Sequence, residues 1–130
     1  MKLELNNTNF FDEFIKTIKP DNFIKTEYPF LIKDELNSKP YYLTGRYDAV
    51  YKDEGYIIYD WKTLNIPKNI QDDLQTIVYL YSASKIFNTQ FVKIRYVAIE
   101  KLEYKDVEFK NIAYYKERID KIISRYYDIV

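Results

Sequence analysis

The chain has 130 residues, and its 20 basic and 20 acidic side chains give a formal net charge of zero. It contains neither cysteine nor histidine, which excludes disulfides, thiolate zinc sites and iron–sulfur clusters and leaves carboxylates, Lys, Tyr, Gln or a bound metal for any catalysis. A length of this order fits one domain, here residues 1–130, with a single core. Because no apolar run approaches the ~20 residues that span a bilayer and no signal-peptide pattern opens the chain, we expect a soluble, cytoplasmic protein without membrane contact.

The first predicted element is a helix that ends before Pro20. Asn7-Thr8-Asn9 is typical of a helix start, and the apolar positions 11, 14, 15 and 18 share one helical face. Glu13 lies near the first turn, where negative charge suits the helix dipole. We favour this role for Glu13 over that of a metal ligand.

A strand is predicted over residues 23–33, and a polar turn over residues 34–40 follows it. Pro29 lies within the strand and has no backbone donor, which indicates an edge position or a bulge. Glu27 belongs to the same strand. It is either a solvated carboxylate or a third acid of a functional site, and the sequence leaves both interpretations open.

The central feature of the chain is a β-hairpin built from residues 43–51 and 56–63. Both segments are rich in Tyr, Thr, Val and Ile, as strands are, and Asp53-Glu54-Gly55 between them is typical of a turn. The second segment has two distinct faces, because side chains alternate along a strand. Asp60 and Lys62 point to one face, and we expect the other face, which carries Ile57, Tyr59 and Trp61, to be the better buried.

The length of the hairpin loop decides which residue lies opposite Asp48. A four-residue loop pairs Asp48 with Tyr59, whereas a three-residue loop pairs Lys52 with Tyr56 and Asp48 with Asp60. We favour the three-residue loop, because Gly55 occupies the position where such loops need a residue at positive φ.

Two opposed carboxylates are an unusual feature of a strand pair. Opposed residues share a face, with Cβ atoms about 5 Å apart, and two ionised carboxylates at that distance repel by roughly 3 kcal/mol at an effective dielectric near 20. A compensating cation is therefore expected beside Asp48 and Asp60. Lys62 offers one positive charge, and a divalent metal offers two and prefers oxygen ligands. These residues predict a metal site.

A helix is predicted over residues 68–87, with Asn88 as its C-terminal stop. Its apolar face consists of Ile70, Leu74, Ile77, Val78 and Tyr81. Gln75 and Tyr79 are four residues apart and stack on one face. An amide and a phenol at this spacing are common at a core boundary, so a functional interpretation depends on the neighbouring motifs.

Three segments complete the chain. Residues 90–100 alternate like a strand, which should run parallel to a hairpin strand because a helix crossover precedes it. Residues 101–110 form one more short strand or a loop. A final helix starts near Asn111. Its apolar side consists of Ile112, Tyr115, Ile119, Ile122, Ile123 and Tyr126, and the basic residues Lys116, Arg118, Lys121 and Arg125 lie largely opposite.

Three ordered motifs carry a resemblance to a known family: Gly45-x-x-Asp48, Asp60-x-Lys62-Thr63 and Gln75-x-x-x-Tyr79. The set resembles the RecB-like branch of the PD-(D/E)XK nuclease superfamily, and the upstream Glu27-Tyr28-Pro29-Phe30 resembles the acidic strand that often precedes the first motif there. The resemblance implies an α/β fold with an αβββαβ core, in which helices flank a central mixed sheet. The order of the predicted elements matches that core independently of the motifs.

The resemblance implies hydrolysis of phosphodiester bonds assisted by Mg²⁺ or Mn²⁺. The implied metal ligands are Asp48, Asp60, the backbone carbonyl of Trp61 and, through a water, Glu27. Lys62 would orient the attacking water or stabilise developing negative charge. The implied catalytic residues are Asp48, Asp60, Lys62, Gln75 and Tyr79, and the implied substrate contacts are Arg46, Thr63, Gln75 and Tyr79.

The function we expect is that of a metal-dependent deoxyribonuclease, which hydrolyses single-stranded or end-containing DNA as an exonuclease in repair or recombination. Without cysteine it cannot hold the four-cysteine iron–sulfur cluster of some RecB-like nucleases associated with CRISPR systems. No helicase motif is present, so a helicase or recombination partner would be a separate chain. Homodimerisation fits so small a nuclease.

Two other classes of function stay open. The first is a catalytically inactive nuclease-fold subunit that binds nucleic acid or assists assembly, which the zero net charge and the missing histidine fit. The second is a small α/β interaction module with an accidental motif match, in which Asp48 and Asp60 would face opposite sides of the hairpin.

Overall fold

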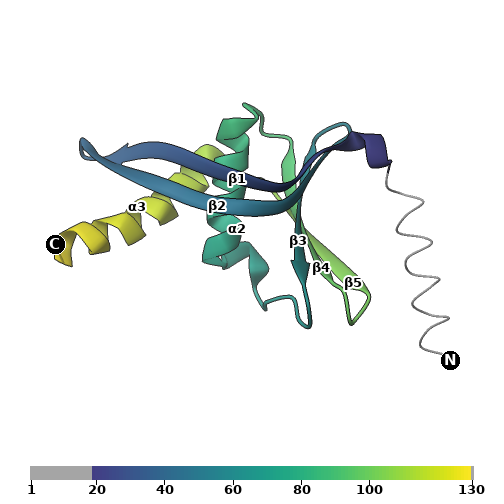
Figure 1. Cartoon of the computed structure of the whole chain (residues 1–130). Coiled ribbons are helices and arrows are strands. Elements are labelled where there is room, and N and C mark those ends of the chain that lie inside the picture. Colours follow the sequence, from purple (N-terminus) through teal and green to yellow (C-terminus); the bar gives the residue numbers. More distant parts are fainter. Residues whose placement is uncertain (1–18, 130) are drawn as a thin grey trace, which may run out of the picture.

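The described part of the chain forms a five-stranded mixed sheet with helices packed against it (Figure 1). The computed structural model describes residues 19–129, so the predicted first helix and Glu13 lie outside the described residues. The strands are β1 (Phe23–Leu36), β2 (Lys39–Lys52), β3 (Tyr56–Lys62), β4 (Val92–Ala98) and β5 (Glu103–Glu108), in that spatial order. The α-helices within residues 19–129 are α2 (Leu74–Ile86) and α3 (Ile112–Ile129). These elements confirm the predicted α/β class with a central mixed sheet.

The strand pairings follow the predicted connections. β1, β2 and β3 are successive antiparallel neighbours, α2 is the crossover, and β4 returns parallel to β3. Residues 101–110, which the sequence left as a strand or a loop, contain β5, antiparallel to β4. Among the described strands, β1 lies at an edge of the sheet, which is one of the two alternatives that Pro29 indicated. Among the described helices, none is long and apolar enough to cross a membrane.

β1 and β2 are longer than predicted and form a curved arm that extends over α2 and α3 (Figure 1). The predicted turn over residues 34–40 shrinks to Asn37 and Ser38, which have φ angles of 51° and 68°. Two successive residues at positive φ match the right-handed twist of the flanking strands. Asp34 and Glu35 therefore belong to β1 rather than to a loop.

The main core lies on the side of the sheet that α2 and α3 cover. It contains buried residues of β1 to β4, α2 and α3: Phe30, Ile32, Tyr41, Leu43, Tyr47, Val50, Ile58, Ile77, Leu80, Tyr81, Ile94, Tyr96, Tyr115 and Ile119. Ile58 belongs to this core, so Asp60 and Lys62 point to the same covered side. The prediction that the opposite face is the better buried is wrong: Tyr59 is buried there in a small cluster, but Trp61 is 39% exposed.

The side-chain alternation of β2 shifts by one residue near Asp48. Tyr47 belongs to the main core, whereas Ala49 belongs to the cluster on the opposite face and Val50 to the main core again. On β1, Glu27 lies between the pairs Thr26–Ala49 and Tyr28–Tyr47 and has a φ of 52°. The irregularity therefore places Asp48 where the arm meets the sheet.

The helix α2 begins later than the sequence predicted. Asn69 adopts a left-handed conformation, a short 3₁₀ helix covers Ile70–Asp72, and Asp73 is extended, so the α-helix starts at Leu74. At the other end, Asn88 has a φ of 49°, and this left-handed residue is the predicted C-terminal stop.

The predicted two sides of α3 are only partly correct. Tyr115 and Ile119 are buried, but Ile112, Ile122 and Tyr126 are exposed. Lys116, predicted on the solvent side, packs inward and donates to the Tyr41 hydroxyl and the Asp120 carboxylate, both at 2.8 Å.

A polar cluster around Asp34 attaches the arm to both helices. Its carboxylate accepts hydrogen bonds from the Tyr81 hydroxyl and from Lys85, and it forms an ion pair with Lys116 at 3.5 Å. Burial raises the pKa of Asp34, but the hydrogen bonds from Tyr81, the Glu35 backbone and Lys85 outweigh burial and lower the pKa to about 2. The ionised carboxylate therefore stabilises the attachment.

Candidate active site

The hairpin has the predicted three-residue loop. Lys52 pairs with Tyr56, and the regular pairing continues to Ala49 and Tyr59. The predicted positive φ at Gly55 is wrong, because Gly55 does not have one. A Cβ atom on Gly55 would instead lie 2.6 Å from the Phe91 carbonyl oxygen, which accepts a hydrogen bond from the Tyr56 N–H. Glycine is needed here for close backbone approach.

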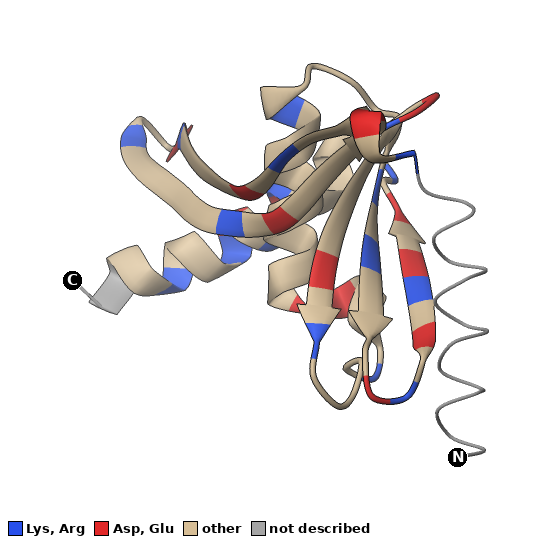
Figure 2. Cartoon of the chain, turned by 45° about the vertical axis from the view of Figure 1, so that its right-hand side comes forward, with Lys and Arg blue, Asp and Glu red and all other residues tan. Residues whose placement is uncertain are grey.

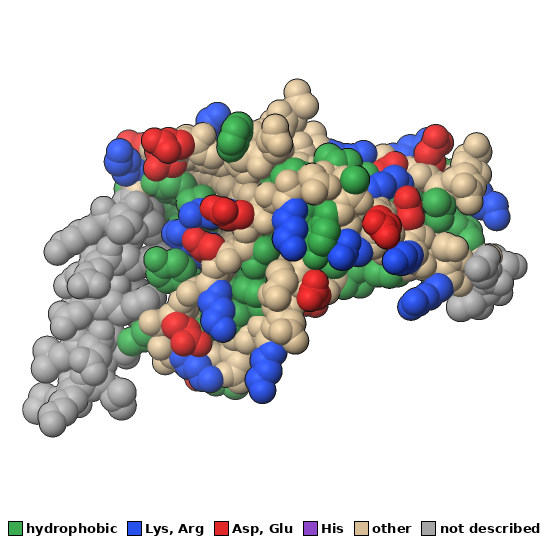
Figure 3. All heavy atoms as spheres, turned by 180° about the vertical axis from the view of Figure 1, so that it is seen from behind, with side chains coloured by type: hydrophobic (Ala, Val, Ile, Leu, Met, Phe, Trp, Pro, Cys, Tyr) green, Lys and Arg blue, Asp and Glu red, His purple; other side chains and the backbone are tan. Residues whose placement is uncertain are grey.

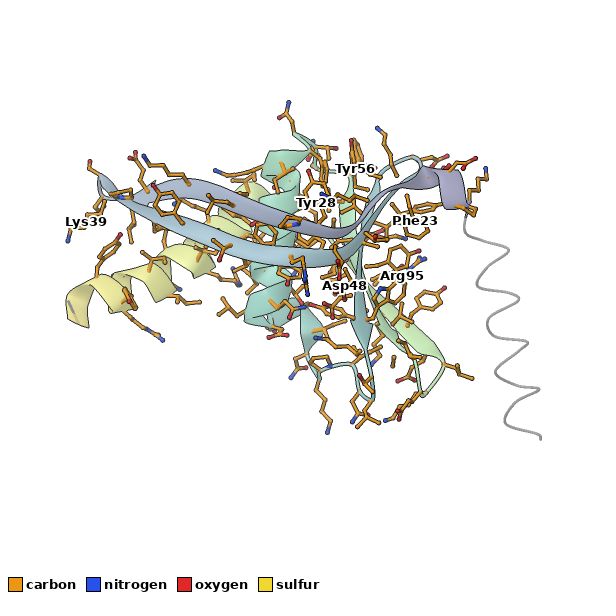
Figure 4. All side chains as sticks on the ribbon, in the orientation of Figure 1. Phe23, Tyr28, Lys39, Asp48, Tyr56 and Arg95 are labelled. Carbon is orange, nitrogen blue, oxygen red and sulfur yellow. The ribbon has the colours of Figure 1, made fainter. Side chains whose placement is uncertain are left out.

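The regular pairing ends at Ala49 and Tyr59, and Asp48 and Asp60 are the next residues along the two strands. The Asp48 carboxylate accepts a hydrogen bond from the Trp61 N–H at 2.7 Å, so it reaches across to β3 at the point where the ladder ends. Figure 4 shows Asp48 on the side of β2 toward β3 and α2. The charge of Asp48 also raises the pKa of Asp60, which means that the two carboxylates are electrostatic neighbours.

Asp60 is the most buried charged group of the described residues, with 7% of its surface exposed. Its Oδ1 accepts a hydrogen bond from Gln75 Nε2 at 3.0 Å. Its Oδ2 lies 3.0 Å from Lys62 Nζ, but no described residue gives this buried oxygen a hydrogen bond of good geometry. Burial raises the pKa of Asp60, and the attraction of Lys62 opposes but does not cancel this effect.

Lys62 combines an ion pair with access to solvent. Its side chain is 28% exposed, and its ammonium lies 5.6 Å from the centre of the Tyr96 ring, a favourable cation–π distance. The ammonium is therefore held near Asp60 and can still reach a ligand that approaches from solvent.

Tyr79 links α2 to β2. Its hydroxyl donates to the Arg46 carbonyl at 3.0 Å, and its own carbonyl accepts from the Tyr47 hydroxyl at 3.1 Å. The motif residue Gly45 makes room for this arrangement, because a Cβ atom there would lie 2.6 Å from the Phe30 ring and 3.1 Å from the Tyr79 ring. In the free protein, the Tyr79 hydroxyl thus connects α2 to β2.

Comparison with known proteins identifies the family. The model of the PD-(D/E)XK nuclease superfamily matches residues 8–129. The chain belongs to this superfamily. Six chains of solved structures are also similar to this chain. One, titled "Crystal structure of SSO0001", has a TM-score of 0.53 and 17% sequence identity, and the match covers 92% of this chain and 59% of that one. That likeness shows the fold alone. No curated protein matches the chain.

The other predicted ligands and substrate contacts include three exposed side chains. Arg46 and Thr63 are exposed. Glu27 is exposed too, and its register position is opposite Asp48, but its positive φ interrupts the regular pairing there. Within residues 19–129, no group of three acidic, histidine or cysteine side chains is arranged to hold a metal. The structure thus brings together Asp48, Asp60, Lys62 and Gln75, and it leaves Glu27 outside a ligand cluster.

Two buried residues beside Asp60 were not predicted as part of the site. Tyr96 lies next to Asp60 in the β3–β4 pairing, and its hydroxyl is 2.6 Å from the Thr76 hydroxyl. In the sequence, Tyr96 looks like any apolar residue of an alternating strand. Thr76 had one available signal, because it directly follows Gln75 of the third motif.

The donor groups fit a divalent cation that prefers oxygen ligands. Asp60 Oδ2 is a buried anionic oxygen without a good hydrogen bond from the described residues, and Asp48 supplies a second carboxylate beside it. Two carboxylates with several open positions are typical of a Mg²⁺ site, which retains waters and binds substrate phosphates. The residues present therefore fit Mg²⁺ or Mn²⁺.

Proposed function

We propose that this superfamily member is a Mg²⁺- or Mn²⁺-dependent deoxyribonuclease of the RecB-like type, which acts as an exonuclease on single-stranded or end-containing DNA. The observation that carries the proposal is the buried Asp60 carboxylate, with Asp48 beside it and Lys62 at 3.0 Å. Burying one carboxylate next to another is unfavourable unless a cation offsets their repulsion. We further propose a role in repair or recombination, with DNA as the main partner.

Each side chain of the site has a defined part in this proposal. Asp48 and Asp60 would hold the metal, together with the Trp61 carbonyl. When bound, the metal would act as a Lewis acid and neutralise charge on the phosphoryl oxygens. The Trp61 N–H keeps Asp48 in place, and Gln75 keeps one oxygen of Asp60 occupied. The other Asp60 oxygen, Oδ2, lies 3.0 Å from Lys62 Nζ and would also bind the cation.

Lys62 is the residue best placed to assist the chemical step. Its partly exposed ammonium can hold the attacking water or donate a hydrogen bond to a phosphoryl oxygen as negative charge develops there. Gln75 has a second N–H that can reach a phosphate while the first remains on Asp60. The exposed Arg46 and Thr63 would contact the flanking phosphates.

The charge on the rest of the surface affects how strongly the protein should attract DNA. Residues of both signs occur on β3 and β5 (Figure 2), and acidic and basic side chains are interspersed on the face shown in Figure 3. With zero net charge, long-range steering of DNA is weak. We therefore expect modest affinity for DNA in the absence of the metal.

The test is cleavage of end-labelled single-stranded DNA, double-stranded DNA and RNA of one sequence, in EDTA, Mg²⁺ or Mn²⁺. We expect metal-dependent degradation of DNA from an end, and its loss in Asp60→Asn and Lys62→Gln. A closed circular single strand should resist degradation, because it has no end. Cleavage of circles as fast as linear strands would contradict the exonuclease assignment.

The sheet offers a matched control for each active-site variant. Lys93 and Asp106 form an ion pair at 3.1 Å, and the Lys93 side chain is 30% exposed, close to the 28% of Lys62. Lys93→Gln and Asp106→Asn should therefore retain cleavage whenever they fold. Cleavage that persists in Asp60→Asn would identify a contaminant, and DNA binding without cleavage by the wild type would support the inactive, DNA-binding alternative.

A further inference from the structure

A buried hydrogen bond connects α2 with β4 directly behind the proposed metal site. Thr76 Oγ1 and the Tyr96 hydroxyl are 2.6 Å apart. Both residues are fully buried, with 0% of their surfaces exposed. Burial raises the pKa of Tyr96, so the phenol stays neutral and can donate or accept in this pair.

Each member of the pair adjoins a group that contacts Asp60. Thr76 is the residue after Gln75, whose amide donates to Asp60 Oδ1 at 3.0 Å. Tyr96 lies opposite Asp60 in the parallel β3–β4 ladder, and its ring lies 5.6 Å from the Lys62 ammonium that contacts Asp60 Oδ2. One hydrogen bond thus joins the helix that carries Gln75 to the ring beside Lys62.

Packing alone does not require this polar pair. An apolar pair of the same shape, such as valine and phenylalanine, would fill the same space at nearly neutral cost, because a buried hydrogen bond contributes little net stability once the desolvation of both partners is counted. A hydrogen bond adds direction, however, since the hydroxyls must stay at a fixed distance and angle.

We propose that the Thr76–Tyr96 hydrogen bond is a positioning device that sets Gln75 and Lys62 on the two oxygens of Asp60, and so prepares that carboxylate for the cation. Thr76 and Tyr96 touch neither substrate nor metal in this proposal. Their effect on cleavage rests on the nuclease function proposed above, but their effect on Gln75 can be measured without it.

The experiment is a double-mutant cycle of Thr76→Val, Tyr96→Phe and the double variant. Thr76→Val leaves the Tyr96 hydroxyl buried without its partner, so we expect a lower melting temperature. The double variant removes both hydroxyls and should regain most of the wild-type melting temperature. If the pair positions the site, the double variant should still show kcat reduced by about tenfold or more, with KM for DNA little changed.

Two measurements separate positioning from packing without relying on cleavage. The side-chain amide signal of Gln75 in NMR spectra reports its hydrogen bond to Asp60, and calorimetry with Mn²⁺ alone reports metal affinity. We expect the Gln75 signal to move in all three variants and Mn²⁺ affinity to fall. Tyr115→Phe is the control, because Tyr115 is also buried but contacts Lys110 and Glu108 on another side of the fold.

The outcomes are distinguishable. If the double variant regains the wild-type Gln75 signal, Mn²⁺ affinity and kcat together with its stability, the pair is a packing feature and the inference is wrong. If the wild type fails to cleave DNA, the proposed function fails, while the Gln75 signal and Mn²⁺ affinity still decide whether the pair positions Asp60 and its neighbours.

Discussion

Replacing Asp60 by asparagine should make the metal-free protein more stable while it removes the metal site. Burial raises the pKa of Asp60 above its ordinary value, which means that ionisation is less favourable in the folded chain than in the unfolded chain. This carboxyl group therefore favours folding at low pH, and it opposes folding once the pH exceeds its folded pKa. Asparagine keeps the shape and the hydrogen bond from Gln75 without the buried charge.

The expected magnitude follows from burial and from linkage. A single stabilising substitution commonly gains about 0.5–2 kcal/mol, which corresponds to a rise of roughly 2–8 °C in Tm for a chain of this size. In the wild type, a metal at 100 times its Kd adds about 2.7 kcal/mol, or roughly 10 °C. Asp60→Asn should lose this second increment, since its remaining partner Asp48 is a single carboxylate.

The assay is thermal unfolding of both proteins in EDTA and in a Mn²⁺ series. Asp106→Asn is the contrasting control. Burial raises the pKa of Asp106, but hydrogen bonds and attraction from Arg95 and Lys93 outweigh it and lower the pKa, so its ionised form stabilises the fold and its loss should reduce Tm. A full metal-dependent rise in Asp60→Asn would place the cation elsewhere. A reduced Tm of Asp60→Asn in EDTA would refute the argument from burial.

Three further predictions concern the arm and the motifs. The pKa of Asp34 is about 2 when folded against 3.8 ordinarily, so it contributes about 2 kcal/mol above pH ~4 that is lost as the pH falls toward 2; urea unfolding of Asp34→Asn should show that loss and a flatter pH dependence. Gly55→Ala forces a Cβ atom within 2.6 Å of the Phe91 oxygen and should destabilise by about 1–3 kcal/mol in the same assay, and an unchanged midpoint would contradict this. Tyr79→Phe loses the hydrogen bond to Arg46 and about 1 kcal/mol; weaker DNA binding at unchanged stability would instead mark Tyr79 as a substrate contact.

Local sequence determined where the two strands of the hairpin and its turn lie. The alternation of residues 43–51 and 56–63, together with a turn at Asp53-Glu54-Gly55, was enough to locate the hairpin and to limit its loop to three or four residues. The choice of three residues, which pairs Lys52 with Tyr56, is confirmed, although Gly55 lacks the positive φ expected of it. A two-residue period and a turn signal are properties of neighbouring residues, so they locate the two strands without knowledge of the distant chain. The three motifs identified the superfamily for the same reason.

Only the tertiary structure decided which face is buried and what each motif residue contacts. Ile57, Tyr59 and Trp61 are more apolar than the opposite side of β3, but α2 and α3 pack against the side of Asp60. Burial depends on which elements meet, and residues far apart in sequence settle that.

The same reason applies to the close contacts of the site. Gly55 meets the Phe91 backbone, and Thr76 meets Tyr96 across 20 positions of the chain. A pattern read along one strand or one helix carries no information on such partners, because the contact exists only once two elements have packed together. The carboxylates could thus be found from the sequence, while their surroundings had to be observed.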